Sequence, residues 1–258
     1  MSGVCVIQGV GVGGGDDSML FDKLFDKDFT VIVVGDHSGS MGDYMRVVPS
    51  CLEEVERETV ANNGNFVMIA FDDRARCARH VCDIPFVRGG GTSLPAGFEM
   101  LNLVLNANPI PADAKIFVIF VSDGQDSHLT AAEVVKAIGS LPRDKKLGRV
   151  VFISAAFGSG FPTHIALDLR HIYHTGNGAF PFIYGISVNS DIEPAMNEIM
   201  GAILRSVRGE EVLMYDANTP AVDMPAALSA SISNTCVRLA YERDPKRYIF
   251  AIFQWIMF

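Results

Sequence analysis

The stretch Thr30-Val-Ile-Val-Val-Gly-Asp-His-Ser-Gly-Ser40 decides the fold of this chain. It begins with an apolar, β-rich run over 30–35, and unbroken runs of this kind are typical of strands that helices cover on both faces. Asp36, Ser38 and Ser40 follow at once, so the run is predicted to deliver one carboxylate and two hydroxyls to the mouth of a buried strand. Oxygen ligands of this mix suit a hard divalent cation and suit zinc poorly.

Two more oxygen-bearing side chains occupy similar positions further along the chain. Thr92 lies in the glycine-led loop Gly89-Gly-Gly-Thr-Ser93, and Asp123 follows the apolar run 116–121. Open α/β sheets place their binding sites at the carboxyl ends of strands. The sequence therefore predicts that these oxygens gather at one edge of a sheet.

Strand-like and helical stretches alternate from about residue 28 to residue 209, which is the signature of an α/β fold with a mostly parallel sheet. The strands are predicted over 30–34, 66–71, 75–82, 116–121, 150–156 and 180–188. The helices are predicted over 44–61, 94–106, 130–139, 162–173 and 191–207. The run 75–82 follows Asp72-Asp73 so closely that it predicts a hairpin, and hence one antiparallel edge strand.

The order Asp-x-Ser-x-Ser, loop Thr and strand-end Asp resembles the von Willebrand factor type A domain family over about residues 28–209. The resemblance implies a three-layer, Rossmann-like fold with a mostly parallel central sheet, one antiparallel edge strand and helices on both faces. It also carries over that family's metal-ion-dependent adhesion site, whose five residues here are Asp36, Ser38, Ser40, Thr92 and Asp123.

The same resemblance implies a non-catalytic protein-interaction module. The three hydroxyls would touch Mg2+ or Mn2+, and the two Asp side chains would act directly or through water. One coordination position would stay open for a Glu or Asp of a protein partner. The rim expected to set partner specificity consists of His37, Met41, Asp43, Tyr44, Ser93 and Gln125.

Two other functions compete with this interpretation. Gly9-Val-Gly-Val-Gly-Gly14 satisfies a dinucleotide-binding pattern, with Asp36 at the distance of a ribose-binding acid. Asp16-Asp17 would then lie where the pyrophosphate must sit, which favours a glycine-rich lead-in instead. A Mg2+-dependent phosphohydrolase of the haloacid dehalogenase type also needs a strand-end Asp. It needs a second Asp two residues later as general acid, and Ser38 occupies that place.

Composition restricts the expected binding partners and cellular location of the protein. A net charge of −9 at pH 7 argues against nucleic-acid binding. Five cysteines form no framework spacing, and no secretory signal is evident at the N-terminus, so a reducing, cytoplasmic location is expected. No apolar run reaches the roughly 18 residues of a spanning helix, so membrane association is not expected. Residues 1–27 are interpreted as a lead-in and 210–258 as a linker and extension, with a strand expected near 248–258.

Overall fold

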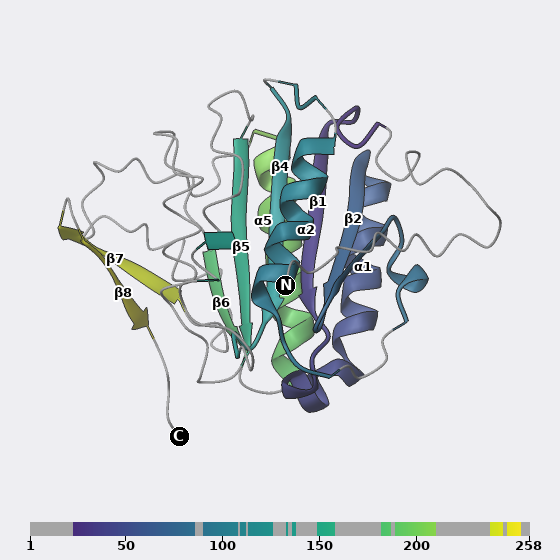
Figure 1. Ribbon diagram of the computed structural model, residues 1–258. Coiled ribbons are helices and arrows are strands. Elements are labelled where there is room, and N and C mark those ends of the chain that lie inside the picture. Colours follow the sequence, from purple (N-terminus) through teal and green to yellow (C-terminus); the bar gives the residue numbers. More distant parts are fainter. Residues whose placement is uncertain are drawn as a thin grey trace.

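A six-stranded sheet with the order β3-β2-β1-β4-β5-β6 forms the centre of the computed structural model (Figure 1). Its strands are β1 (Phe29–Asp36), β2 (Gly64–Phe71), β3 (Ala75–Ala78), β4 (Lys115–Ser122), β5 (Arg149–Phe157) and β6 (Phe182–Ile186). All neighbouring strands pair in parallel except β2 and β3, which are antiparallel. The predicted fold class is confirmed. The structure describes residues 23–85, 90–107, 109–111, 113–125, 133, 136–137, 149–157, 182–186, 189–209, 238–244 and 247–253.

Helices cover both faces of the sheet because β1 and β2 are mostly apolar on both faces, and every one of their residues is buried. Val31 and Val33 pack with the buried side chains of α1 (Val48–Ala61) and α5 (Ile192–Val207). Ile32 and Val34, which point to the opposite face, pack with those of α2 (Leu94–Ala107). Figure 1 shows α2 in front of the sheet, with α1 and α5 behind it.

The helix predicted over 44–61 begins later, at Val48, and its first part is a separate 3-10 helix, η2 (Gly39–Arg46). Gly42 interrupts η2 with φ 48° and ψ −124°, a backbone shape that side-chain-bearing residues rarely adopt. Pro49 then lies in the first turn of α1, where a missing N–H costs nothing. The turn that carries Ser38 and Ser40 is thus separated from α1 by the remainder of η2.

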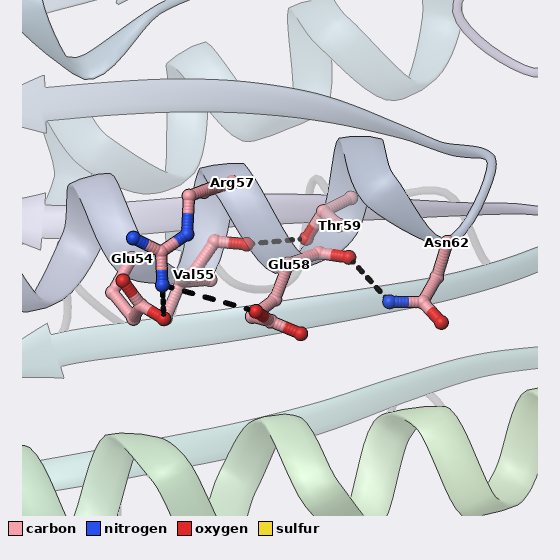
Figure 2. Close-up of polar contacts among 6 residues, drawn as sticks. All are labelled: Glu54, Val55, Arg57, Glu58, Thr59 and Asn62. Atoms are coloured by element: carbon pink, nitrogen blue, oxygen red, sulfur yellow. Dashed lines mark hydrogen bonds and ion pairs between the residues drawn. The ribbon is translucent and has the colours of Figure 1, made fainter.

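Polar contacts along α1 are local and stabilise the helix itself (Figure 2). Arg57 forms ion pairs with Glu54 and Glu58 on the outer face. The Thr59 hydroxyl donates to the Val55 carbonyl at 2.7 Å, and the Asn62 amide donates to the Glu58 carbonyl at 2.8 Å, closing the helix end. None of these groups belongs to the sheet edge that carries the candidate site, so they provide neutral positions for control variants.

The strand predicted over 75–82 is shorter than expected. It ends at Ala78, and Val81–Asp83 forms a 3-10 turn, η3. The Glu56 carboxylate of α1 accepts a hydrogen bond from the Val81 N–H at 2.8 Å and contacts the His80 ring at 2.6 Å. This contact from a distant part of the chain pulls the backbone out of the β2–β3 ladder, so run length alone overestimated the strand.

Several predicted segments lie outside the described residues. These are the glycine-rich motif 9–14, the helix 162–173 and most of the helix 130–139, of which Glu133, Lys136 and Ala137 are described as helical. Near the C-terminus, β7 (Arg238–Asp244) and β8 (Arg247–Phe253) form an antiparallel pair, which includes part of the strand expected near 248–258. Within the described ranges, no helix combines the length and the apolar character needed to cross a membrane.

Candidate functional site

The candidate site lies at the carboxyl ends of the neighbouring strands β1 and β4. β1 pairs with β2 on one side and with β4 on the other. The connection from β1 to β2 passes through α1 on one face, whereas the connection from β3 to β4 passes through α2 on the other. Open α/β sheets bind ligands at such a switch point, beyond the carboxyl ends of the strands. Asp36 ends β1 and Asp123 directly follows β4, so both predicted carboxylates lie at this point.

Asp36 is only 1% exposed, and both of its carboxylate oxygens accept hydrogen bonds. The Ser38 backbone N–H donates to Oδ1 at 2.8 Å, and the Ser122 hydroxyl donates to Oδ2 at 2.7 Å. Burial raises the pKa of Asp36 from its usual 3.8 to about 6, although the hydrogen bonds from Ser38 and Ser122 lower it; the nearby charge of Asp123 raises it further. The carboxylate is therefore fixed in direction and carries a charge that the protein alone compensates incompletely.

Ser38 and Ser40 present their hydroxyls side by side, with the two Oγ atoms 2.8 Å apart. Adjacent ligands of an octahedral Mg2+ with bonds of 2.0–2.1 Å are separated by about 2.9 Å, so this pair already matches one edge of the octahedron. Ser38 is 1% exposed, whereas Ser40 is exposed. A cation bound by both hydroxyls would be buried on the side of Ser38 and open to solvent on the side of Ser40.

Asp123 holds an acceptor that the protein leaves unused. Its Oδ1 accepts the Gln125 N–H at 3.0 Å, but Oδ2 is buried and has no hydrogen-bond partner among the described residues. A buried acceptor without a partner costs about 1–3 kcal/mol. A cation beside Oδ2 would remove that cost, so the donor set present fits a hard divalent metal.

Thr92 is 3% exposed, and the loop that carries it is held against the serine turn. The Gly39 N–H donates to the Gly90 carbonyl at 3.5 Å, and the Ser93 N–H donates to the Asp72 carbonyl at 2.8 Å. These backbone contacts bring the loop that carries Thr92 to the ends of β1 and β2. In the described part of the chain, no three His, Cys, Asp or Glu side chains cluster for metal binding. An ion at this edge would accordingly depend on hydroxyl ligands.

The structure corrects two of the six rim residues predicted from the sequence. His37 is 5% exposed and Met41 is fully buried in the core against α1. The His37 N–H still donates to the Phe71 carbonyl at 2.7 Å, which holds the backbone against β2 one residue beyond the end of β1. Burial lowers the pKa of His37 from 6.5 to about 4; Asp72 opposes this effect and Arg76 adds to it.

The other four rim positions reach the surface to different extents. Asp43 and Gln125 are exposed, and Tyr44 and Ser93 are half-buried. The Tyr44 ring packs edge-on against Phe157, with ring centroids 4.7 Å apart, and burial together with the charges of Asp123 and Asp191 raises the pKa of its hydroxyl. Asp43 is joined to η4 (Asn189–Asp191) by a hydrogen bond from the Asn189 amide to its carbonyl at 3.3 Å. The accessible rim therefore includes a contact between η2 and η4 that spacing did not predict.

Ser122 is a residue of the site that sequence reasoning did not single out. It is fully buried at the end of β4 and donates its proton to Asp36. A signal was present in the sequence, because a polar residue ends the otherwise apolar run of β4 directly before Asp123.

Comparisons with known proteins find a likeness of fold alone. No family model matches the sequence, and no curated protein sequence matches it. The pilus adhesin SpaC from Lactobacillus rhamnosus GG, in its open conformation, has a TM-score of 0.50 at 11% identity, over 69% of this chain and 30% of that chain. A von Willebrand factor type A protein from Catenulispora acidiphila has a TM-score of 0.49 at 18% identity, over 67% of this chain and 42% of that chain.

The vWF domain of the pili tip protein Mfa5 from Porphyromonas gingivalis has a TM-score of 0.47 at 11% identity, over 69% of this chain and 96% of that chain. This chain spans less than half of the first two proteins. At such identities the likeness concerns the fold. The chain has the Rossmann-like α/β architecture predicted from its sequence, and von Willebrand factor type A domains are among the structures that resemble it.

Proposed function

We propose that this chain is a metal-dependent protein-interaction module. Mg2+ or Mn2+ would be held by the hydroxyls of Ser38, Ser40 and Thr92, with Asp123 and Asp36 in the first or second coordination shell. A protein partner would supply a Glu or Asp side chain to the open position. The observation that carries the proposal is the buried Oδ2 of Asp123, which has no hydrogen-bond partner in the part of the chain that the structure describes and lies at the same end of the sheet as the paired serine hydroxyls. Because fold alone does not determine function, the proposal rests on this site.

The ligand chemistry favours capture of a carboxylate. Neutral hydroxyls withdraw little of a cation's charge, so a bound Mg2+ remains strongly attractive to an incoming carboxylate. The protein's own part is to aim the Ser38 and Ser40 oxygens at one point and to keep water from the buried side. Asp36 supports this by holding the Ser38 backbone at 2.8 Å. Ser40, which is exposed, leaves the outer side of the site accessible to a partner.

The same geometry argues against phosphoester hydrolysis. A strand-end nucleophile needs an accessible oxygen, but Asp36 is 1% exposed and each of its oxygens already accepts a hydrogen bond. The position two residues later, where a general acid would be required, is Ser38, whose hydroxyl does not lose or gain a proton near pH 7. Phosphoester turnover that co-purifies with the protein and disappears in Asp36→Asn would refute the binding function.

Thr92→Ala is expected to weaken metal-dependent partner capture by roughly tenfold while leaving the fold intact. The substitution removes one hydroxyl ligand from a loop whose backbone contacts remain. The measurement is capture of partner from native lysate on immobilised protein in Mg2+ and in EDTA, quantified across a protein concentration series.

Thr59→Ala provides the matched control for that experiment, because Thr59 is equally buried but lies on α1 and bonds only within its helix (Figure 2). Thr59→Ala should retain full capture in Mg2+. Capture that EDTA leaves unchanged, or that both Thr variants reduce equally, would contradict a role for the metal and for Thr92.

The proposal includes a reducing, cytoplasmic compartment. Cys51, Cys77 and Cys82 are free thiols, of which only Cys82 is exposed. Burial raises the pKa of the Cys77 thiol to about 12, so it should react with thiol reagents only after unfolding. Peptide mapping after labelling should find Cys82 modified in the native protein and Cys77 modified only in denaturant. Stable disulfides in freshly isolated protein would contradict the assignment to this compartment.

A further inference from the structure

Ser122 occupies the point where the two central strands separate. The backbone ladder between β1 and β4 ends at the pair Gly35 and Val121. On their other sides both strands continue for one more residue, since Asp36 still pairs with Phe71 and Ser122 with Ala156. Beyond the ladder, the 2.7 Å bond from the Ser122 hydroxyl to Asp36 Oδ2 joins β1 and β4. A side-chain bond thus continues the strand pairing where the backbone stops.

The direction of that bond follows from the chemistry of its two groups. An ionised carboxylate can only accept, and a serine hydroxyl has one proton to donate, so that proton goes to Asp36. Ser122 Oγ also accepts a hydrogen bond from the Gly124 N–H at 2.8 Å. Donor and acceptor roles are therefore ordered from the Gly124 backbone through Ser122 to Asp36, and such chains strengthen each member.

Ser122 is also tied to the second carboxylate. It directly precedes Asp123, so the turn that returns the Gly124 N–H to Ser122 is the turn that carries Asp123. Asp123 Oδ1 in turn accepts the Gln125 N–H at 3.0 Å, and its buried Oδ2 has no hydrogen-bond partner within the described ranges. One side chain thereby fixes the Asp36 carboxylate and the local turn that aims Asp123. The sheet itself does not need this bond, because six residue pairs already join β1 and β4.

We infer that Ser122 is a positioning residue for the metal site: it holds Asp36 and the Asp123 turn in the arrangement that binds the cation, without contacting the cation. This inference rests on the proposed metal-binding function. Residues that hydrogen-bond metal ligands without touching the metal typically contribute about 10–100-fold to metal affinity. Loss of the Ser122 hydroxyl should therefore lower the metal affinity by roughly that factor.

The test measures the Mn2+ affinity of the full chain by titration calorimetry, with near-ultraviolet circular dichroism to confirm folding. Ser122→Ala should bind Mn2+ at least tenfold more weakly than wild type. The matched control is Ser154→Ala on β5, which removes an equally buried serine hydroxyl with no hydrogen-bond partner among the described residues. Ser154→Ala should bind like wild type, which separates positioning from general loss of a buried hydroxyl.

A second pair of variants keeps the test decisive if Ser122→Ala folds poorly. Ser122→Thr and Ser122→Val have the same shape and differ only in the hydroxyl, so Thr should restore affinity relative to Val. Equal Mn2+ affinity in Thr and Val, or in Ser122→Ala and Ser154→Ala, would overturn the role of Ser122 and leave the metal site standing. A wild type that binds no Mn2+ would overturn the metal-binding function and the role of Ser122 with it.

Discussion

Asp36→Ala is expected to reduce Mg2+ and Mn2+ affinity by roughly 100-fold, the largest effect of any single substitution in the site. The variant removes a charge beside the proposed metal position and also releases the Ser38 N–H and the Ser122 hydroxyl from their shared acceptor. At roughly 100-fold, the loss corresponds to about 2.7 kcal/mol of binding free energy. Titration calorimetry with each metal measures it directly.

The control for this substitution is Asp83→Ala, which removes an exposed carboxylate in η3, away from the strand ends that carry the candidate site. That variant should titrate like wild type. Identical heats for wild type and Asp36→Ala would contradict the assignment of Asp36 to the metal site.

The second large effect concerns pH and arises from two neighbouring residues that act in opposite directions. The pKa of Asp36 is raised from 3.8 to about 6 in the folded protein, so between these values the folded state binds more protons than the unfolded state. Stability from this group is therefore lost as pH rises from about 4 to 6. The pKa of His37 is lowered from 6.5 to about 4, so the unfolded state binds more protons and stability rises with pH over nearly the same window.

Each shift corresponds to roughly 3 kcal/mol, at 1.36 kcal/mol for each factor of ten in proton affinity. In wild type without metal, the two contributions should nearly cancel between pH 4 and 6. Asp36→Asn leaves only the His37 contribution, so its free energy of unfolding should rise by roughly 3 kcal/mol between pH 4 and 6.5. His37→Gln leaves only the Asp36 contribution, so its free energy of unfolding should fall by a similar amount.

Urea denaturation of the three proteins at a series of pH values, with chelator present, measures these slopes. The other titrating groups are common to all three proteins, so the differences between the slopes report on Asp36 and His37. Parallel slopes in all three would contradict the opposed shifts. Because the proposed metal would bind the site with Asp36 charged, Mg2+ affinity of the wild type should also decline as pH falls below about 6.

The sequence predicted the parts of this molecule that depend on local pattern. The apolar runs of β1, β2 and β4 are long and unbroken, so their existence and their parallel arrangement followed directly. Since parallel strands end at a common edge, the meeting of Asp36 and Asp123 followed as well. These predictions needed only periodicity and the rule that sites lie at strand ends.

The features that the sequence did not predict depend on contacts between distant segments. β3 ends early because Glu56, more than 20 residues upstream, accepts the Val81 N–H. His37 is buried at a position where its backbone pairs with Phe71, a contact that exists only once β1 and β2 are side by side. The role of Ser122 likewise depends on the end of the β1–β4 ladder at Gly35. No spacing rule within one segment contains this information.

The shortness of the edge strand β3 also restricts how another polypeptide can bind to this edge of the sheet. A sheet border with unpaired N–H and C=O groups invites an extended segment to join it as an extra strand. Here that border is only four residues long, Ala75–Ala78, and the chain turns away into η3 immediately afterwards. An incoming segment would find too few backbone groups for a durable ladder, so this flank resists both polymerisation and strand-by-strand recruitment. Under the proposed function, a partner approaching from this flank would be recognised by side chains at the end of the sheet instead of by added strands.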